Sequence, residues 1–468
     1  MTGDLPDTAR PGDKIILTGL VRLFQEQGRK KTSNPLTFSM RVTGNNIEFV
    51  EGQSNLTVSD EDKKQIQSMS EHSDFIERLI AGFAPHVKGN ELIKEALIYC
   101  LVGSEEIVLG NGMRKRADIH EFLVGDPGSA KSEMLKFVAR VAPRGFYTSG
   151  KGSSGVGITA TVVQDKNGLW TLEAGPMVLG DKGIVAIDEF DKMKPEDKAN
   201  LHEVMEQQTI SIAKGGITTT LNARTTVLAA ANPMYGKYDP LKTLFENLKD
   251  IPIPLLTRYD LIFIVKDVPN KERDQEIADH IFDLYSNKRL SVRPIETDVL
   301  TKYFAYARSK PKVNLPSRLK EQVTKYYLNI RQGADPSEIT ITPRQLEAII
   351  RLSIARARTR LANEVDEFDV IRAIEIIEEC YKQVGTDPNT GKVDHGVLEG
   401  KPQREIKKER LWDDLLKNYG DEVPIKEIVE EMVLSGVWNK EEANKWIHDK
   451  FSDNKIIGTK QGYFRRMV

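Results

Sequence analysis

The chain has 468 residues, of which 39% are apolar, and its formal net charge is -2. This length allows two to four domains with their own cores, and the near-neutral charge excludes a globally basic nucleic-acid binder. Any contact with DNA must therefore come from local basic patches. The only cysteines are Cys100 and Cys380, which excludes a disulfide framework or a cysteine-rich zinc site and suits a reducing compartment. Because no long apolar run or signal pattern is present, we expect an intracellular protein without a membrane span.

The first 52 residues have the composition of β structure. Short runs at 14–18, 36–42 and 47–50 favour strands, and Gly44–Asn46 predicts a turn between the last two. This segment is too short for a complete domain, so we interpret it as the end of a small OB-like barrel. The basic run Arg29–Lys31 lies between two of these strands, where a solvated loop and a phosphate contact are equally open.

A helical region follows a polar linker. Ser59 precedes three acidic residues, an arrangement that favours a helix start, and apolar helical periodicity continues to Cys100. Asn111–Gly112 then predicts a hairpin turn. We expect six segments: 1–52 partial OB-fold, 53–75 linker, 76–270 α/β core, 271–384 helical lid, 385–403 flexible linker and 404–468 tail domain.

A glycine-bearing loop follows the apolar run 122–124 and precedes a helical pattern at 133–138. Strand, loop and helix in this order are typical of a phosphate-binding loop, whose backbone N–H groups and helix dipole attract phosphates. Lys131 would reach the β- and γ-phosphates, and the Ser132 hydroxyl would bind Mg²⁺. Ala130 replaces the usual glycine, and the alternative is a chance Gly/Ser-rich turn. The expected nucleotide contacts are Gly125, Asp126, Pro127, Gly128, Ser129, Ala130, Lys131 and Ser132.

Polar residues also follow two further apolar runs, 183–187 and 227–231. Both runs predict parallel strands that are buried on both faces, and ligands bind at the carboxyl ends of such strands. Asp188 would hold Mg²⁺ through water, and Glu189 would polarise the attacking water. Asn232 would sense the γ-phosphate. The alternatives are a strand that ends in solvated acids and, for Asn232, an ordinary Asn-Pro turn.

Two arginines lie near further predicted elements. Arg258 precedes the apolar strand 261–265, where it could act as an arginine finger or form an ion pair with Asp260. Arg344 lies in the first turn of a helix that a Thr342–Gln345 capping box begins, and spacing alone slightly favours a solvated side chain.

Two hairpins interrupt this core. Strand-like runs at 210–212 and 217–221 flank Lys214-Gly-Gly, and the segment 159–179 contains the turn signal Asn167-Gly168. Residues 404–468 predict three helices and a β-ribbon, an arrangement typical of a winged helix. Because acidic residues lie among Lys440, Lys445 and Lys450, a solvated face or a regulatory contact is favoured there over specific DNA reading.

Six stretches occur in one order: GDPGSAKS, IVAIDEFDKM, LHEVMEQQTISIAKGGI, AAANP, LLTRYDLIF and ITPRQLEAIIRLS. Together they resemble the minichromosome maintenance (MCM) replicative helicases of the archaeal type, in which an alanine at position 130 is also usual. The resemblance implies an α/β fold: an AAA+ P-loop NTPase core with a parallel sheet and helical lid, assembled as a homo-hexameric ring around single-stranded or forked DNA. Replication-fork loading and accessory proteins would be its partners in the cytoplasm of an archaeal cell, at the nucleoid.

The resemblance also implies roles for individual residues. Lys131, Ser132, Asp188, Glu189 and Asn232 match positions that act on ATP and Mg²⁺ within one subunit. Arg258, Arg344 and Gln207 match positions that act on the neighbouring subunit's site, and Lys214 matches a hairpin lysine that contacts DNA. The sequence around Arg258 is Thr-Arg-Tyr-Asp, whereas the family usually has Ser-Arg-Phe-Asp at the arginine finger.

One departure concerns the amino-terminal region. The family carries a helical subdomain and a zinc-binding element there, and this chain has neither a CxxC pair nor room for that subdomain. We therefore expect most of the amino-terminal domain to be missing and the motor to be intact. An AAA+ remodelling ATPase that acts on protein is the alternative function, and a non-hydrolysing ring clamp is disfavoured by Lys131, Glu189 and Arg258.

Overall fold

A computed structural model describes most of the chain. The described residues are 15–25, 38–49, 58–108, 110–112, 114–151, 157–164, 170–214, 217–234, 236–239, 244–248, 251–266, 269–286, 295–310, 312–332, 343–385, 408, 411–412, 415–416, 419, 423–435, 437–452, 456–460 and 463–466. Across these ranges, every helix is too short or too polar to cross a membrane.

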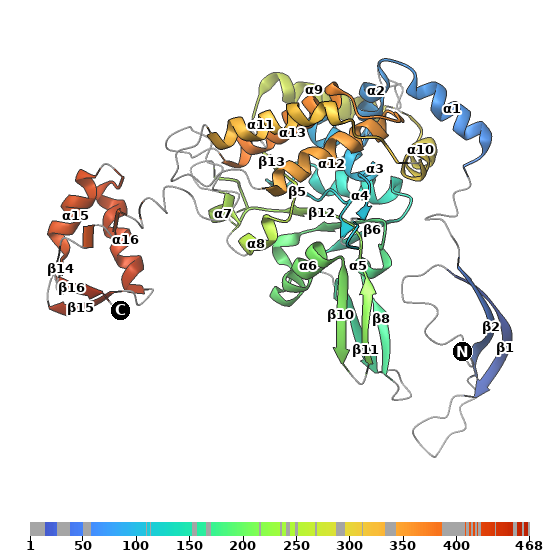
Figure 1. The fold of residues 1–468 in the computed structure, drawn as a ribbon. Helices are drawn as coiled ribbons and strands as arrows, with labels where there is room; N and C mark the ends of the chain where they lie inside the picture. Colours follow the sequence, from blue (N-terminus) through green and yellow to red (C-terminus); the bar gives the residue numbers. More distant parts are fainter. Residues whose placement is uncertain are drawn as a thin grey trace.

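The core is built on a parallel sheet with strand order β13-β5-β12-β9-β6 (Figure 1). Four of these strands are the predicted apolar runs, and burial on both faces explains why their sequences do not alternate. β6 was not predicted, because this edge strand is only partly buried and carries polar residues. The five strands are β5 (Glu121–Gly125), β6 (Gly145–Ser149), β9 (Ile184–Asp188), β12 (Thr226–Ala231) and β13 (Leu261–Val265).

Helices cover the sheet and continue into a helical lid (Figure 1). α3, α4 and α13 contact the sheet directly, and α12 packs on both α3 and α13, so that sheet and lid share one apolar core. The helix start predicted after Ser59 is confirmed, and Ser59 and Asp62 form a capping box at the beginning of α1. The helices of this part are α1 (Asp60–Ser70), α2 (Phe75–Gly82), α3 (Glu91–Val102), α4 (Lys131–Val141), α5 (Pro176–Leu179), η1 (Phe190–Lys192), α6 (Pro195–Gln207), α7 (Leu244–Asn247), α8 (Ile253–Leu256), α9 (Lys271–Tyr285), α10 (Thr297–Ser309), η2 (Ser317–Leu319), α11 (Lys320–Gln332), α12 (Pro343–Thr359) and α13 (Glu367–Gly385).

A buried carboxyl group lies inside this core, at the start of β5. Glu121 is fully buried, its Oε2 accepts a hydrogen bond from the Cys100 thiol, and its Oε1 has no partner. Burial raises the pKa of Glu121 well above its ordinary value of 4.5. Ionisation of this carboxyl is therefore harder in the folded protein than in the unfolded chain.

We expect Glu121→Gln to stabilise the protein at pH 7.5 and to have little effect at pH 4.5. Above pH 4.5 the unfolded chain ionises Glu121 more readily than the folded protein does, so folding carries a free-energy cost that is absent when both states are protonated. Denaturant unfolding at the two pH values measures the difference. An equal shift in the free energy of unfolding at both pH values would contradict a protonated Glu121.

Three predicted hairpins are confirmed. β3 (Ile107–Val108) pairs with β4 (Arg114–Lys115) around Asn111–Gly112. β7 (Ala160–Gln164) pairs with β8 (Trp170–Ala174), and β10 (Thr209–Lys214) pairs with β11 (Ile217–Asn222). The β7–β8 and β10–β11 hairpins lie side by side below the sheet in Figure 1, and β7 contacts β10. The turn residues Asn167-Gly168 and Gly215-Gly216 lie outside the described residues.

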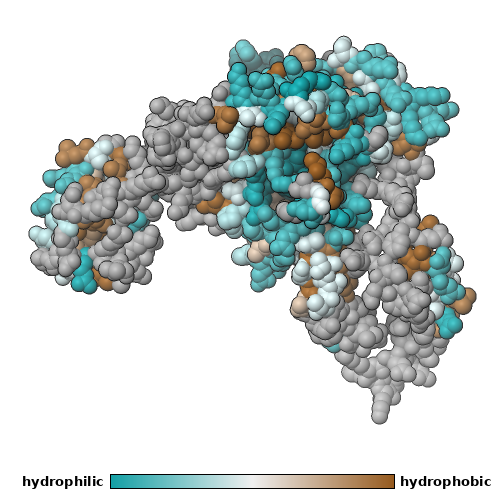
Figure 2. Space-filling model, in the orientation of Figure 1, coloured by the Kyte–Doolittle hydropathy of each residue, from teal (hydrophilic) through white to brown (hydrophobic). Residues whose placement is uncertain are grey.

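The amino-terminal strands differ from the prediction in one respect. β1 (Ile15–Gln25) pairs with a single long strand, β2 (Phe38–Phe49), so the turn predicted at Gly44–Asn46 is wrong. The Gly and Asn residues instead form a bulge, where the register shifts between Thr18 and Gly19. Apolar side chains of this hairpin are exposed (Figure 2), and none of them belongs to the core beneath the lid. The basic run Arg29–Lys31 lies outside the described residues.

The carboxyl-terminal part has a separate apolar core. A three-stranded antiparallel sheet packs with two helices there, and the Asn439 side chain caps the second helix as predicted. Lys450 is buried with its Nζ 4.6 Å from the centre of the Trp446 ring, so it does not belong to a basic DNA-facing surface. The elements are β14 (Val423–Pro424), α15 (Ile425–Leu434), α16 (Lys440–Ser452), β15 (Ile456–Lys460) and β16 (Tyr463–Arg466).

Candidate active site

The predicted phosphate loop lies at the carboxyl end of β5. Gly125 is required there, because a Cβ at this position would lie 2.1 Å from the Val265 carbonyl oxygen of β13. Gly128 and Ala130 both have left-handed backbones, with φ of 81° and 62°. The alanine therefore adopts the conformation that the usual glycine would supply, at a cost of about 1 kcal/mol.

Lys131 begins α4 and folds back over the loop. Its Nζ donates hydrogen bonds to the carbonyl oxygens of Gly125 and Asp126 at 2.8 and 2.7 Å and to Ser129 Oγ at 3.0 Å. Burial lowers the pKa of Lys131 to about 8, against the opposing charges of Asp126, Asp188 and Asp191. The ammonium group thus lies in the concavity of the loop and is held there by neutral oxygen atoms. Phosphate oxygens that enter the loop could bind to it.

The two predicted acids lie together at the end of β9, close to the loop. Asp188 accepts hydrogen bonds from the Tyr147 hydroxyl (2.7 Å, to Oδ2) and from the Glu189 N–H (2.8 Å, to Oδ1). Glu189 Oε2 accepts a hydrogen bond from Ser149, 3.1 Å away, and Oε1 is paired with Lys192. The hydrogen bond from Lys192 lowers the pKa of Glu189, so this carboxylate stays ionised at neutral pH.

Asn232 follows β12, the strand between β5 and β9, so it lies at the same edge of the sheet as Lys131 and Asp188. Its backbone N–H donates to Asp191 Oδ1 at 3.0 Å. Asp126 of the loop accepts a 2.6 Å hydrogen bond from the N–H of Tyr238, in the segment that follows Asn232. The Asp126 side chain therefore joins the phosphate loop to the segment that follows the expected sensor, and the Asp191 side chain holds the backbone of Asn232.

This edge of the sheet fits a nucleotide and its Mg²⁺. Open space lies above Gly128, the helix α4 begins at the loop, and Lys131 supplies a positive charge. Asp188 and Ser132 supply the oxygen ligands that Mg²⁺ prefers. No three His, Cys, Asp or Glu side chains among the described residues cluster closely enough to hold a metal ion without such help from phosphates and water.

The predicted trans-acting residues gather at a second place. Gln207, Arg258 and Arg344 line one cavity of about 480 Å³, together with Arg114, Lys115, Arg116 and Arg224. Arg344 donates a 2.9 Å hydrogen bond to the Thr257 carbonyl, so it is not simply a solvated helix residue. Thr342, the expected helix cap, lies outside the described residues. Six basic side chains line this cavity against two acidic ones, Glu206 and Glu347, so the lining carries an excess of positive charge that favours anions.

Arg258 does not pair with Asp260, which corrects the alternative considered from the sequence. Asp260 is instead bound by Arg116 at 3.0 Å and Arg351 at 2.6 Å, and these charges lower its pKa to about 2 although burial alone would raise it. Arg258 is paired with Glu206 and approaches the His202 ring. Sequence reasoning missed Glu206 and Arg116 as partners of this region, since only the fold brings them here.

The two groups of residues lie at opposite ends of the sheet. Leu261 at the start of β13 pairs with Glu121 at the start of β5, and Val265 pairs with Gly125. Arg258 precedes Leu261, whereas Lys131 follows Gly125. The five residues of β5 separate the ends by about 13 Å. Arg258 therefore cannot reach a phosphate held by the Lys131 of the same chain.

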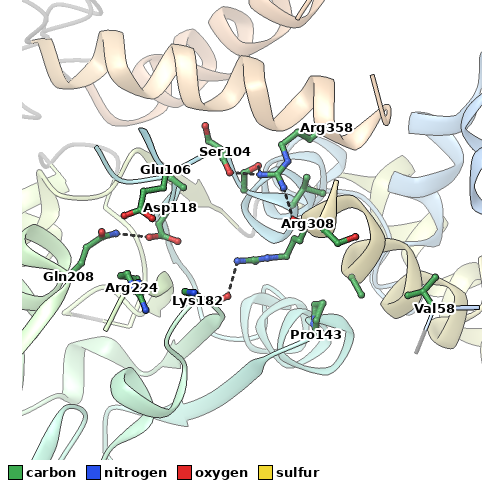
Figure 3. A pocket seen from close by; sticks show the side chains of 15 residues that line it. Val58, Ser104, Glu106, Asp118, Pro143, Lys182, Gln208, Arg224, Arg308 and Arg358 are labelled. Atoms are coloured by element: carbon green, nitrogen blue, oxygen red, sulfur yellow. Dashed lines mark hydrogen bonds between the residues drawn. The ribbon is translucent and has the colours of Figure 1, made fainter. Parts of the chain in front are cut away.

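A second cavity, of about 560 Å³, lies between the sheet and the lid (Figure 3). All three of its arginines are bound: Arg308 donates to the backbone carbonyls of Leu101 and Lys182, and Arg358 donates to that of Ser104. Arg224 is paired with the Asp181 carboxylate. Arg308 and Arg358 are already used in fixing the lid to the core. We therefore do not assign this cavity to the active site.

A P-loop on a parallel sheet, with two acids at the end of β9 and a helical lid, defines a P-loop domain of the AAA+ class. The family comparison agrees and is more specific. The MCM P-loop domain matches residues 62–285, and the MCM AAA-lid domain matches residues 298–381. The chain belongs to the minichromosome maintenance family.

Curated proteins of this family are similar over most of the chain. The minichromosome maintenance protein MCM of Saccharolobus solfataricus is 43% identical over 406 residues, which cover 86% of this chain and 58% of that protein. DNA replication licensing factor MCM4 of Arabidopsis thaliana is 37% identical, with 84% and 50% covered, and mcm7 of Schizosaccharomyces pombe is 38% identical, with 80% and 50% covered. The chain thus spans about half the length of the curated relatives it matches.

Proposed function

We propose that the chain is the motor of an ATP-dependent replicative DNA helicase that works as a ring of identical subunits. The separation of Lys131 from Arg258 across the sheet is the observation that supports this most strongly. One subunit supplies the phosphate loop and acids, and the next supplies Arg258, Arg344 and Gln207. Six subunits per ring is the number that the family resemblance implies, and each interface would hold one ATP.

Hydrolysis would proceed by in-line attack of water on the γ-phosphate. Glu189, held by Ser149 and Lys192, orients and polarises this water, and Asn232 positions it or the γ-phosphate. Lys131 and the neighbour's two arginines stabilise the charge that develops on the transferring phosphoryl group. Ser132, and Asp188 through water, would hold Mg²⁺, which would supply positive charge to the phosphate oxygens.

The β10–β11 hairpin would couple this reaction to DNA. β10 follows α6 after a single residue, and α6 carries Glu206 and Gln207 at the interface. If Arg258 and Arg344 shift on hydrolysis, α6 would transmit this movement to the hairpin that carries Lys214. The side chain of Lys214 lies outside the described residues, so its contact with DNA rests on the family resemblance.

The remaining parts complete the proposal. Residues 1–52 would form the end of an OB-like domain, 53–75 a linker, 76–270 the ATPase core, 271–384 the lid, and 404–468 a winged helix after a linker at 385–403. The β14–β16–β15 sheet with α15 and α16 is consistent with a winged helix. The substrates would be single-stranded and forked DNA, at the nucleoid of an archaeal cell, with loading and accessory proteins of the replication fork as partners.

A forked-duplex assay tests the proposed function. The chain should unwind the fork with ATP and Mg²⁺, its ATPase should rise when DNA is added, and its mass in solution should be that of a ring. An AAA+ remodeller of protein substrates would hydrolyse ATP without stimulation by DNA. ATPase activity that does not rise when DNA is added, together with no unwinding of the fork, would contradict the helicase proposal.

We expect Lys214→Ala to keep most of the ATPase activity but to lose unwinding. The substitution leaves the phosphate loop and the arginines in place and removes only the charge at the hairpin tip. ATPase and fork unwinding are measured on the same preparation, with Lys237→Ala as a surface control. If Lys214→Ala unwinds the fork at the parent rate, the hairpin does not pull DNA.

A further inference from the structure

Two hydroxyl side chains of the edge strand β6 face the two acids of the site. Tyr147 and Ser149 are two residues apart, so they project from the same face of the strand. Ser149 pairs with Asp188 in the parallel register, and Gly150 N–H continues the pairing by donating to the Asp188 carbonyl at 2.7 Å. This strand is therefore fixed against the end of β9, where both acids lie.

Each hydroxyl holds a different acid. The Tyr147 O–H donates to Asp188 Oδ2 at 2.7 Å, and the Ser149 O–H donates to Glu189 Oε2 at 3.1 Å. Neither the family match nor the expected catalytic set assigns a role to Tyr147. Tyr147 is 40% exposed, so its hydroxyl could donate its hydrogen bond to water and needs no protein partner. We therefore attribute the hydrogen bond to Asp188 to its effect on the orientation of that carboxylate.

We propose that Tyr147 is a positioning residue that orients Asp188 for the Mg²⁺ of bound ATP. This proposal rests on the proposed nucleotide site. Asp188 would bind the metal through water, and a carboxylate can order such a water only when its own rotation is fixed. Tyr147 holds Oδ2 and the Glu189 N–H holds Oδ1, at 2.8 Å, so the carboxylate cannot turn.

The orientation leaves the metal side of the carboxylate available. Each carboxylate oxygen has two lone pairs, and the two hydrogen bonds occupy one lone pair on each oxygen. The remaining lone pairs could accept hydrogen bonds from a water on Mg²⁺ when the metal is bound. Replacing Tyr147 by Phe removes one oxygen atom and keeps the ring, so that it tests the hydrogen bond and not the packing.

The test measures binding and not turnover. A fluorescent, non-hydrolysable ATP analogue is bound to the parent and to Tyr147→Phe, first in EDTA and then at increasing Mg²⁺. We expect equal affinity for the analogue in EDTA and about a tenfold rise in the half-saturating Mg²⁺ concentration for Tyr147→Phe. Ser149→Ala is the matched control, since it removes a hydroxyl from the same face and should leave the Mg²⁺ dependence unchanged.

Each other outcome is decisive. An unchanged Mg²⁺ dependence in Tyr147→Phe would overturn the proposal, as would an equal change in Ser149→Ala. Loss of analogue binding by Tyr147→Phe in EDTA would mean that Tyr147 supports the fold of the site, which also overturns it. If the parent binds no analogue with or without Mg²⁺, the proposed nucleotide site fails, and this result is distinct from a failure of Tyr147 alone. Binding by the parent that does not respond to Mg²⁺ would overturn the role of Tyr147 and leave the nucleotide site standing.

Discussion

Lys131→Ala is expected to lower ATP hydrolysis by at least about a hundredfold, which corresponds to the loss of one well-placed charge at the transferring phosphate. The Lys131 ammonium is buried in the concavity of the loop and is held by carbonyl oxygens and the Ser129 hydroxyl, all neutral acceptors. Phosphate oxygens would bind it more strongly than these acceptors do. Because burial lowers its pKa to about 8, the nucleotide-free loop should also lose affinity for ATP as the pH rises above 8.

A lysine on the same helix provides the control. Lys136 lies just over one turn further along α4, is half exposed, and pairs with Glu133 at 2.9 Å. Lys136→Ala should therefore hydrolyse ATP at close to the parent rate. Steady-state phosphate release measures both variants, and thermal unfolding shows that both are folded. A parent-like rate for Lys131→Ala would remove the phosphate loop from the mechanism.

Arg258→Ala is expected to lower ATP hydrolysis by about a thousandfold or more, as the loss of an arginine finger does. Its phosphate loop is untouched, so nucleotide binding should remain close to normal. Arg258→Lys should recover only a small part of the rate, because an ammonium group lacks the planar fork of the guanidinium. Arg318→Ala removes a surface arginine that pairs with Glu364 and serves as the control.

A high rate for Arg258→Ala would mean that the residue serves only the packing of its own chain. Its contacts with Glu206 and His202 would then be the whole of its function. We expect instead that these contacts fix the Arg258 side chain only while the subunit is isolated and no neighbouring nucleotide is bound. Glu206 is exposed and lies in the last turn of α6, so a neighbour's phosphate could take its place.

The sequence predicted the central strands and the phosphate loop because local patterns determine both. Continuous apolar runs identify strands buried on two faces, and the order of strand, loop and helix identifies the site at the end of β5. Asp188 and Asn232 could be placed for the same reason, since each directly follows such a strand. The hairpin turn at Asn111–Gly112 was likewise a local signal.

What escaped prediction depends on contacts between distant residues. Tyr147 lies on an edge strand with polar residues, so no apolar run marked it. Asp260 lies two residues from Arg258, yet its partners Arg116 and Arg351 are 144 and 91 residues away. The turn signal at Gly44–Asn46 was overridden by pairing with β1, which converts it to a bulge.

The central claim is that two adjoining chains build each site, and mixing two inactive variants tests it most directly. Lys131→Ala and Arg258→Ala are dissociated, combined in equal amounts and reassembled. If the chains mix at random, about a quarter of the interfaces join an intact phosphate loop to an intact arginine, and that fraction of the parent ATPase should return. Mixed rings that stay as inactive as either variant alone would contradict the shared site.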